Sequence, residues 1–197
     1  SGAWTYLYDG RNRLRQAFRK NSAGAVVSRH GFEYDAGDNL TSKTVTPYTQ
    51  KFSDDFSDGN ITANPAWLSV GTWSAASQEA VNTASGSLTP ELSQNIANSD
   101  AEYWYSYKID DVNVSGARTR LLLRRTNATS DCVRVNFNAS SFEIKQQVSG
   151  VSTTLLTNNS VVTASATWYD VYVRASGTTI EVWRGLRGQK LYPVGTV

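Results

Sequence analysis

Trp168-Tyr-Asp-Val-Tyr-Val-Arg-Ala175 leads through Ser-Gly-Thr into Thr179-Ile-Glu-Val-Trp-Arg184, and apolar and polar residues alternate along both segments. Alternation with a period of two is typical of a β-strand with one buried and one solvated face. A glycine in the short connection marks a turn, so the two segments predict a β-hairpin. The buried face predicted for the first strand holds Val171, Val173 and Ala175, and the solvated face holds Asp170, Tyr172 and Arg174.

Similar segments recur along the chain from residue 51 onward. In residues 132–138, for example, Val133, Val135 and Phe137 alternate with polar side chains. Gly, Asn, Ser and Asp separate the segments, and none of them has helical spacing. Such a series is typical of an all-β antiparallel sandwich. We expect strands over residues 67–74, 79–82, 101–109, 117–125, 132–138, 141–147, 153–157, 167–175 and 179–184.

Residues 1–50 differ from the rest in charge and contain a repeat. Tyr8-Asp-Gly-Arg-Asn-Arg-Leu14 returns 26 residues later as Tyr34-Asp-Ala-Gly-Asp-Asn-Leu40. Each copy carries a glycine-containing turn between apolar positions, which predicts two β-hairpins. Seven Lys or Arg oppose four acids in this segment, whereas 12 oppose 13 in residues 51–197. We therefore expect two units, hairpins over 1–50 and a sandwich over 51–197.

The Tyr-Asp-x-x-x-x-Leu motif resembles the YD repeat of Rhs- and teneurin-type surface proteins. In that family many hairpins coil into a β-shell, and the Tyr and Asp side chains bridge neighbouring turns. Two repeats are too few to close a shell, so the resemblance implies raw strand edges that contact the next domain of this chain, other segments of a longer polypeptide or a second copy. Whether residues 1–50 pack on the sandwich or project from it stays open. The absence of Met agrees with a segment processed from something longer.

The later part of the chain resembles the LamG-like or concanavalin A-like jelly rolls of bacterial surface and carbohydrate-active proteins. The landmarks are Asp54-Asp-Phe-Ser-Asp-Gly59, then Trp67 and Trp73, then the Trp168 strand with its Gly-x-x-Ile-x-Val hairpin. This resemblance implies an extracellular or cell-surface location in bacteria. Such jelly rolls usually finish with a Gly-rich strand ending in Phe-Asp-Asn, which this chain does not have. Either the last strand is missing, or another segment takes its place.

The composition gives little support for catalysis. One cysteine, Cys132, and one histidine, His30, exclude a Cys-based zinc cage and leave no His-dependent triad in sight. A glycosidase needs two carboxylates across one cleft. The glutamates of the predicted sandwich are instead dispersed singly among its segments: Glu79, Glu91, Glu102, Glu143 and Glu181. We expect a non-enzymatic protein, with a glycoside hydrolase as the least favoured alternative.

A carbohydrate-binding module needs less, namely an exposed aromatic ring and a few planar polar groups. Forked guanidinium groups bind carboxylate or sulfate through two hydrogen bonds, which favours an anionic polysaccharide. The ordinary alternative is that the aromatic rings fill the sandwich and the arginines pair with Glu143 or Asp170 on a solvated face. The candidate binding residues are Trp104, Trp183, Arg118, Arg120, Arg124 and Arg134.

One loop gathers oxygen donors of the kind that Ca²⁺ prefers. Its candidate ligands are Asp54, Asp55, Asp58 and Asn60. The spacing is not that of an EF-hand, and Asp-Gly-Asn is equally typical of a plain turn. A structural Ca²⁺ ion and a simple turn therefore both remain as interpretations of this loop.

Taken together, these patterns predict a non-catalytic carbohydrate-binding or adhesion module of an extracellular YD-repeat protein, with a polysaccharide or cell-surface glycan as partner. The competing prediction is a structural spacer or interaction domain of the repeat shell without a glycan ligand. An exposed tryptophan beside arginines would favour the first, and burial of the tryptophans the second. A net charge of only +2 without clustered basic residues argues against nucleic acid. The sequence contains no run of about 18 apolar residues, so it predicts no membrane-spanning helix.

Overall fold

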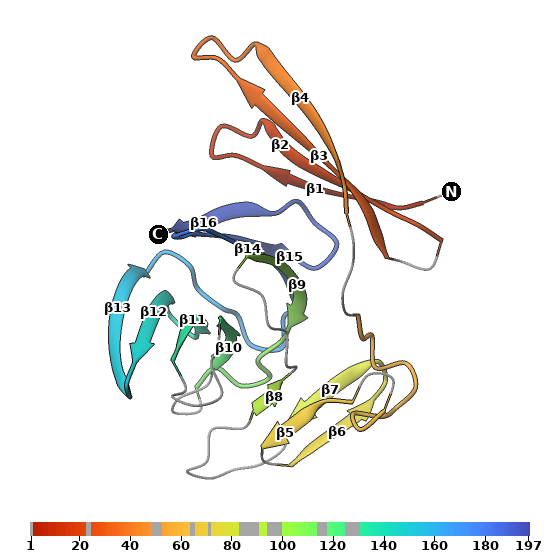
Figure 1. Cartoon of the computed structure of the whole chain (residues 1–197). Helices are drawn as coiled ribbons and strands as arrows, with labels where there is room; N and C mark the ends of the chain where they lie inside the picture. Colours follow the sequence, from red (N-terminus) through yellow and green to blue (C-terminus); the bar gives the residue numbers. More distant parts are fainter. Residues whose placement is uncertain are drawn as a thin grey trace.

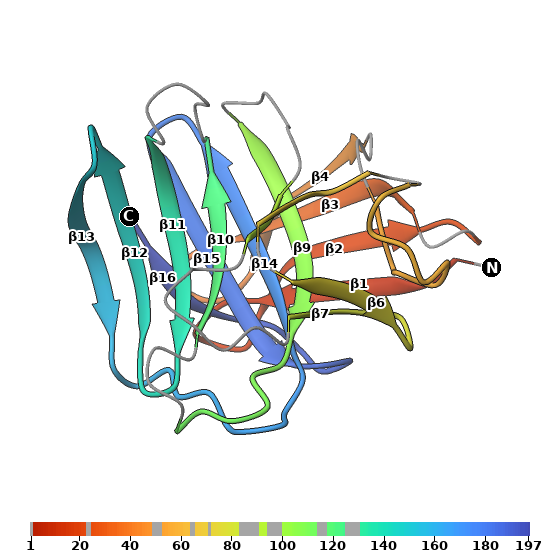
Figure 2. The same ribbon diagram turned by 90° about the horizontal axis from the view of Figure 1, so that it is seen from below.

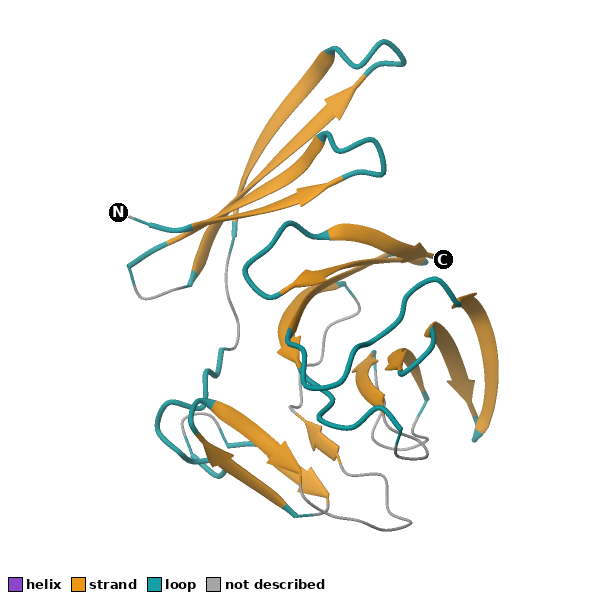
Figure 3. Cartoon of the chain, turned by 180° about the vertical axis from the view of Figure 1, so that it is seen from behind, coloured by secondary structure: helices purple, strands orange, loops and turns teal. Residues whose placement is uncertain are grey.

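A computed structural model describes residues 2–22, 25–48, 53–63, 66–70, 72–82, 91–93, 100–113, 118–124 and 131–197. Every regular element in these ranges is a β-strand, and all the sheets are antiparallel (Figures 1 and 3). The all-β prediction is confirmed. Within the same ranges, no helix that could cross a bilayer is present. The boundary predicted between residues 50 and 51 lies outside the described residues.

The repeat segment forms one four-stranded sheet, which we call the hairpin sheet. Its strands follow the chain in the order β1-β2-β3-β4, each paired with the next. Gly37 and the residues around it turn the chain between the last two strands, as the sequence predicted. The strands are β1 (Trp4–Tyr8), β2 (Leu14–Lys20), β3 (Val26–Tyr34) and β4 (Leu40–Pro47).

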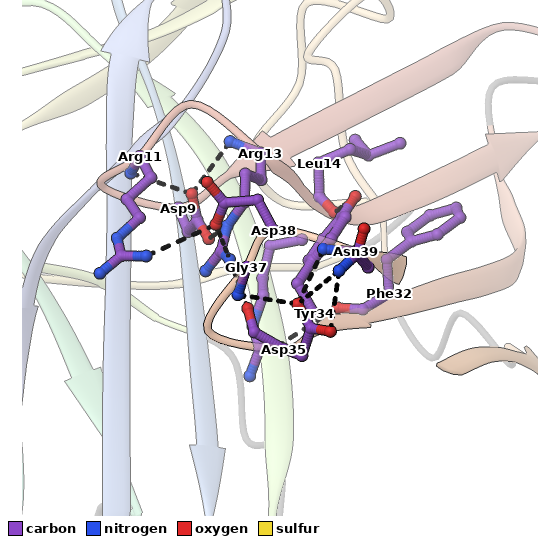
Figure 4. Close-up of polar contacts among 11 residues, drawn as sticks. Asp9, Arg11, Arg13, Leu14, Phe32, Tyr34, Asp35, Gly37, Asp38 and Asn39 are labelled. Atoms are coloured by element: carbon purple, nitrogen blue, oxygen red, sulfur yellow. Dashed lines mark hydrogen bonds and ion pairs between the residues drawn. The ribbon is translucent and has the colours of Figure 1, made fainter. Parts of the chain in front are cut away.

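The two copies of the sequence repeat form the same turn. Asp9 Oδ1 accepts the backbone N–H groups of Arg11 and Arg13 at 3.0 and 2.9 Å. One repeat later, Asp35 Oδ1 accepts those of Gly37 and Asn39, both at 2.9 Å (Figure 4). An aspartate carboxylate that bonds to the backbone just ahead of it is a common way to fix a turn. The 26-residue spacing is therefore a structural repeat as well as a sequence repeat.

Side chains also join the two turns to each other. Arg13 Nη1 lies 2.6 Å from Asp38 Oδ1, and the Arg13 guanidinium lies 4.9 Å from the centre of the Tyr34 ring. The Tyr34 hydroxyl donates to the Leu14 carbonyl at 3.0 Å (Figure 4). Asp38 occupies the left-handed region with φ of 66°, which aspartate tolerates better than most residues. Tyr34 and Asp38 thus contact the neighbouring hairpin, whereas the carboxylate Oδ1 atoms of the motif aspartates Asp9 and Asp35 accept N–H groups of their own turns.

Two further four-stranded sheets pack face to face around a shared apolar core, an arrangement compatible with a β-sandwich (Figure 2). The core includes Val135, Ile144 and Val173, none of which is exposed. The outer sheet consists of β10 (Arg118–Leu123), β11 (Cys132–Asn138), β12 (Phe142–Val148) and β13 (Val151–Asn158). The central sheet has the order β16-β15-β14-β9, with β9 (Ala101–Tyr107), β14 (Tyr169–Ser176), β15 (Thr179–Leu186) and β16 (Tyr192–Thr196).

The hairpin sheet covers the other face of the central sheet and makes a third layer (Figure 1). Phe18 of β2 and Tyr172 of β14 are both fully buried there, with ring centres 5.3 Å apart. The sequence placed Tyr172 on a solvated face, and that prediction is wrong. Asp170 and Arg174 lie on the same face as Tyr172, so the alternation indicated a solvated face. Alternation within one strand cannot show that a segment distant in sequence covers that face.

Two small two-stranded ribbons make up the remainder of the described chain. They pair β5 (Leu68–Val70) with β8 (Glu91–Ser93), and β6 (Trp73–Ala76) with β7 (Glu79–Asn82). The single strand predicted over 67–74 is therefore two strands. The sequence did not predict β16, which pairs with β15 at the edge of the central sheet. The residues at both ends of the strand predicted over 117–125 lie outside the described residues.

Candidate functional site

Three of the predicted arginines lie on the outward face of the outer sheet. The register pairs Arg120 with Asn136 and Leu122 with Arg134, and Arg118 precedes Arg120 by two residues on the same face. Leu121 and Leu123 alternate with them and contact the core. Neighbours on one face of a sheet are roughly 5–8 Å apart, so three guanidinium groups share a small area. We call Arg118, Arg120 and Arg134 the arginine cluster.

The arginines of the arginine cluster repel one another. Burial lowers the pKa of Arg120, and the nearby charges of Arg134 and Arg118 lower it further. Arg120 Nε donates to Asn136 Oδ1 at 3.0 Å. The buried Nε of Arg134 has no hydrogen-bond partner. Asn136 thus holds Arg120 in place, whereas the Nε–H group of Arg134 makes no hydrogen bond.

The acids that could have neutralised these arginines bond elsewhere. Glu143 lies on the next strand, but its carboxylate contacts Lys145 Nζ and Asn138 Nδ2, both at 3.1 Å. Burial would raise the pKa of Glu143, yet these two donors lower it. Asp170 accepts from Ser106 Oγ at 2.6 Å on the central sheet. In the described part of the chain, no acid forms an ion pair with the arginine cluster.

Arg124 does not belong to the arginine cluster. It follows the last residue of β10 in the left-handed backbone region, with φ of 52°. Its Nη2 lies 3.3 Å from Asp100 Oδ1, and the same carboxylate oxygen accepts the Gly177 N–H at 3.0 Å. Arg124 therefore pairs with an acid at the far end of β10 from Arg118.

The structure does not bring the two candidate tryptophans to the arginines. Trp104 and Trp183 lie on the central sheet, on the face that the hairpin sheet covers. Trp183 is 5 % exposed, and the Trp104 ring meets the Phe18 ring edge to face with centres 4.9 Å apart. Tyr172 lies between the two indoles, at 4.5 and 5.3 Å. These rings form an aromatic cluster between two layers, in which Trp183 is buried and Trp104 is partly buried.

The aspartate-rich loop is held by its own backbone. Asp54, Asp55 and Asp58 each accept the N–H group two residues ahead, at 2.7, 3.0 and 2.9 Å, and Asn60 accepts that of Thr62 at 2.7 Å. Each of these oxygens completes a local turn. The second carboxylate oxygen of Asp54 also accepts the Trp67 indole N–H at 2.6 Å. Over the described residues, no three His, Cys, Asp or Glu side chains are grouped as a metal site.

An exposed aromatic pair lies on the outer face of the hairpin sheet. Trp4 and Tyr6 are each 41 % exposed, and their rings are nearly parallel, with centres 6.4 Å apart. His30 meets the Trp4 ring edge to face at 5.0 Å. The alternation of Trp4 and Tyr6 around Thr5 was visible in the sequence. Their exposure was not, because either face of a hairpin sheet can be the one that packs.

Comparisons with known proteins give no relative. No protein-family model matches the chain, and neither a curated protein nor a solved structure is significantly similar to it.

Proposed function

We propose that this chain is a non-catalytic binding module for acidic polysaccharides at a bacterial cell surface. In this proposal the two antiparallel sheets are a LamG-like jelly roll, and the hairpin sheet consists of two YD-type repeats. The observation that supports it is the arginine cluster, in which three cations share one strand pair and, among the described residues, no acid forms an ion pair with them, although the charge of Glu143 raises the pKa of Arg120 against the other causes. A carboxylate or sulfate group would relieve their mutual repulsion.

The chemistry of the arginine cluster favours a repeating anion over a neutral sugar. Hydrogen bonds to a charged partner contribute about 1.5–3 kcal/mol each when both groups are desolvated, and less at an exposed surface. A polymer with one acid per sugar can engage several guanidinium groups at once. Since the cluster is partly exposed, added salt should weaken the complex by screening.

A structural spacer of a repeat shell is the second candidate function. The packing of buried Trp183 and partly buried Trp104 against the hairpin sheet favours it, because these rings hold two layers of the molecule together. The proposed role needs partners for the open edge of β4, where Leu40 and Val45 are 54 % and 55 % exposed. Another hairpin of a longer polypeptide, or a second copy of this chain, would pair there.

Affinity electrophoresis through gels that contain a polyuronate, a sulfated dextran or neutral dextran tests the first function. The charged polymers should retard the protein, neutral dextran should not, and Arg118→Gln with Arg120→Gln should restore free migration. Arg15→Gln serves as the matched control, because it removes one exposed arginine from the hairpin sheet. If neither charged polymer retards the protein, or if Arg15→Gln has the same effect as the cluster variant, the proposal of a glycan ligand is wrong and the spacer remains.

A further inference from the structure

One arginine of the sandwich core has no acidic partner. Arg184 of β15 is 8 % exposed and points between the two sheets, on the same face as Ile180 and Val182. Its Nη1 donates to the Val162 carbonyl at 3.1 Å and its Nη2 to Thr163 Oγ1 at 3.0 Å. In the described residues no carboxylate lies within ion-pair distance of it, and its buried Nε has no hydrogen-bond partner.

Aromatic rings surround this guanidinium. Its Cζ atom lies 3.6 Å from the centre of the Tyr169 ring, 5.2 Å from that of Phe137 and 5.6 Å from that of Tyr107. Cation–π contacts offset part of the cost of desolvating a charge. Buried charges are nevertheless normally paired with an opposite charge, because removing an unpaired charge from water costs free energy. An arginine cannot avoid this cost by losing its proton. The charge of the Arg184 guanidinium thus has no opposite charge beside it among the described residues.

A surface hollow lies next to this residue. It has a volume of about 240 Å³, opens widely to solvent and has a mixed lining of polar and apolar groups. Val162 and Leu186 on its rim are 59 % and 51 % exposed. Its lining includes Ser160, Val161, Arg184, Gly185, Leu186 and Val194.

We propose that this hollow binds a small organic carboxylate that carries a short apolar chain. The carboxylate pairs with Arg184, which lines the hollow, while the chain packs against Val161, Leu186 and Val194. The volume is below the roughly 300–1,000 Å³ of sites for drug-sized ligands, so the ligand is small. A dianion such as phosphate fits less well, since the hollow offers a single cation beside several aliphatic side chains. This site is independent of the arginine cluster, which shares no residue with its lining.

A titration with sodium hexanoate, followed through backbone amide signals by NMR, tests the proposal. Hexanol and sodium chloride at matched concentrations separate the apolar chain from the charge. We expect saturable shifts of Ser160, Gly185 and Leu186 with hexanoate and weak or unsaturated shifts with the two controls. Equal binding of hexanol would overturn the role of Arg184, and hexanoate shifts confined to Arg118, Arg120 and Arg134 would overturn the site.

A rim variant gives the second readout without disturbing the core. Leu186→Glu places a carboxylate at the mouth of the hollow, where it repels an incoming anion. Hexanoate should then bind about tenfold more weakly or worse, which corresponds to about 1.4 kcal/mol. Val151→Glu is the matched control, since Val151 is 70 % exposed at the β12–β13 turn and outside the lining. Unchanged hexanoate affinity in folded Leu186→Glu would overturn the proposal.

Discussion

At the scale of single residues, two aspartates determine how the repeat turns close. Asp9 and Asp35 occupy equivalent places and accept equivalent pairs of backbone N–H groups. The Asn39 side-chain amide, followed by the Asn39 and Gly37 backbone N–H groups, holds the pKa of Asp35 below its ordinary value of 3.8. Because the ionised form is the one that is bonded, each turn depends on a deprotonated carboxylate.

This dependence predicts acid sensitivity of the hairpin sheet. A carboxyl whose pKa is lowered by folding stabilises the native state above its unfolded pKa, and that stability is lost as the pH falls through the native pKa. The urea midpoint of the wild-type protein should therefore fall more steeply below about pH 4 than that of Asp35→Asn. The amide oxygen of this variant accepts the Gly37 and Asn39 backbone N–H groups without titrating, while the bond from Asn39 Nδ2 to the second carboxylate oxygen is lost at every pH. Parallel pH profiles for the two proteins would contradict the assignment.

Phe18 is the residue on which the contact between the hairpin sheet and the central sheet depends most. It is fully buried and meets the rings of Trp104, Tyr172 and Tyr48. Phe18→Ala should cost about 3–5 kcal/mol of unfolding free energy, measured by urea denaturation. Leu40→Ala is the control, because Leu40 is 54 % exposed and its truncation should cost far less. Equal losses would mean that the two layers do not share a core.

At the scale of elements, alternation in the sequence together with flanking turn residues was enough to predict several strands, both in the small ribbon of β6 and β7 and in the outer sheet. Glu79–Asn82 and Cys132–Asn138 were predicted with the bounds observed, since turn residues flank both. The arginine cluster followed from the same period. β16 escaped because Pro193 and Gly195 are poor strand residues, although an edge strand tolerates both.

Gly195 shows why β16 carries so small a residue. A Cβ atom there would lie 2.4 Å from Leu156 Cδ2 and 2.6 Å from Phe142 Cε1, so a larger side chain must displace these two side chains or the strand. Gly195→Ala should cost about 1–3 kcal/mol in urea denaturation. Gly31→Ala in β3 is the control, since its nearest neighbour would be Thr44 Cβ at 4.0 Å. A neutral Gly195→Ala would show that β16 does not pack as described.

At the scale of the whole molecule, the sequence could not predict the third layer or the place of its tryptophans. Trp104 and Trp183 were sugar-binding candidates because indoles are seldom wholly buried within one sheet. Both rings pack in the cluster that contains Phe18, which lies more than eighty residues away in sequence. The alternation of apolar and polar residues within one strand cannot reveal a contact with so distant a segment. The sequence thus indicated the arginine cluster as a group but not its separation from the aromatic cluster.

An ion pair links the hairpin sheet and the central sheet. Arg29 Nη1 donates to Glu102 Oε1, and the other carboxylate oxygen of Glu102 is buried without a partner. Burial, and then the charge of Glu102, raises the pKa of nearby Tyr48. Arg29→Ala should therefore lower the unfolding free energy by about 1.5–3 kcal/mol. In a double-mutant cycle with Glu102→Ala the losses should not add, whereas strictly additive losses would contradict the contact.

The central structural claim is that the hairpin sheet and the sandwich are one cooperative unit in which β2 and β14 protect each other. Native-state hydrogen exchange over a series of urea concentrations, followed by mass spectrometry, measures this most directly. The peptides that cover Leu14–Lys20 and Tyr169–Ser176 should open with the same free energy and the same dependence on urea. Earlier opening of the β2 peptide, with β14 still protected, would show two separate units and contradict the three-layer account.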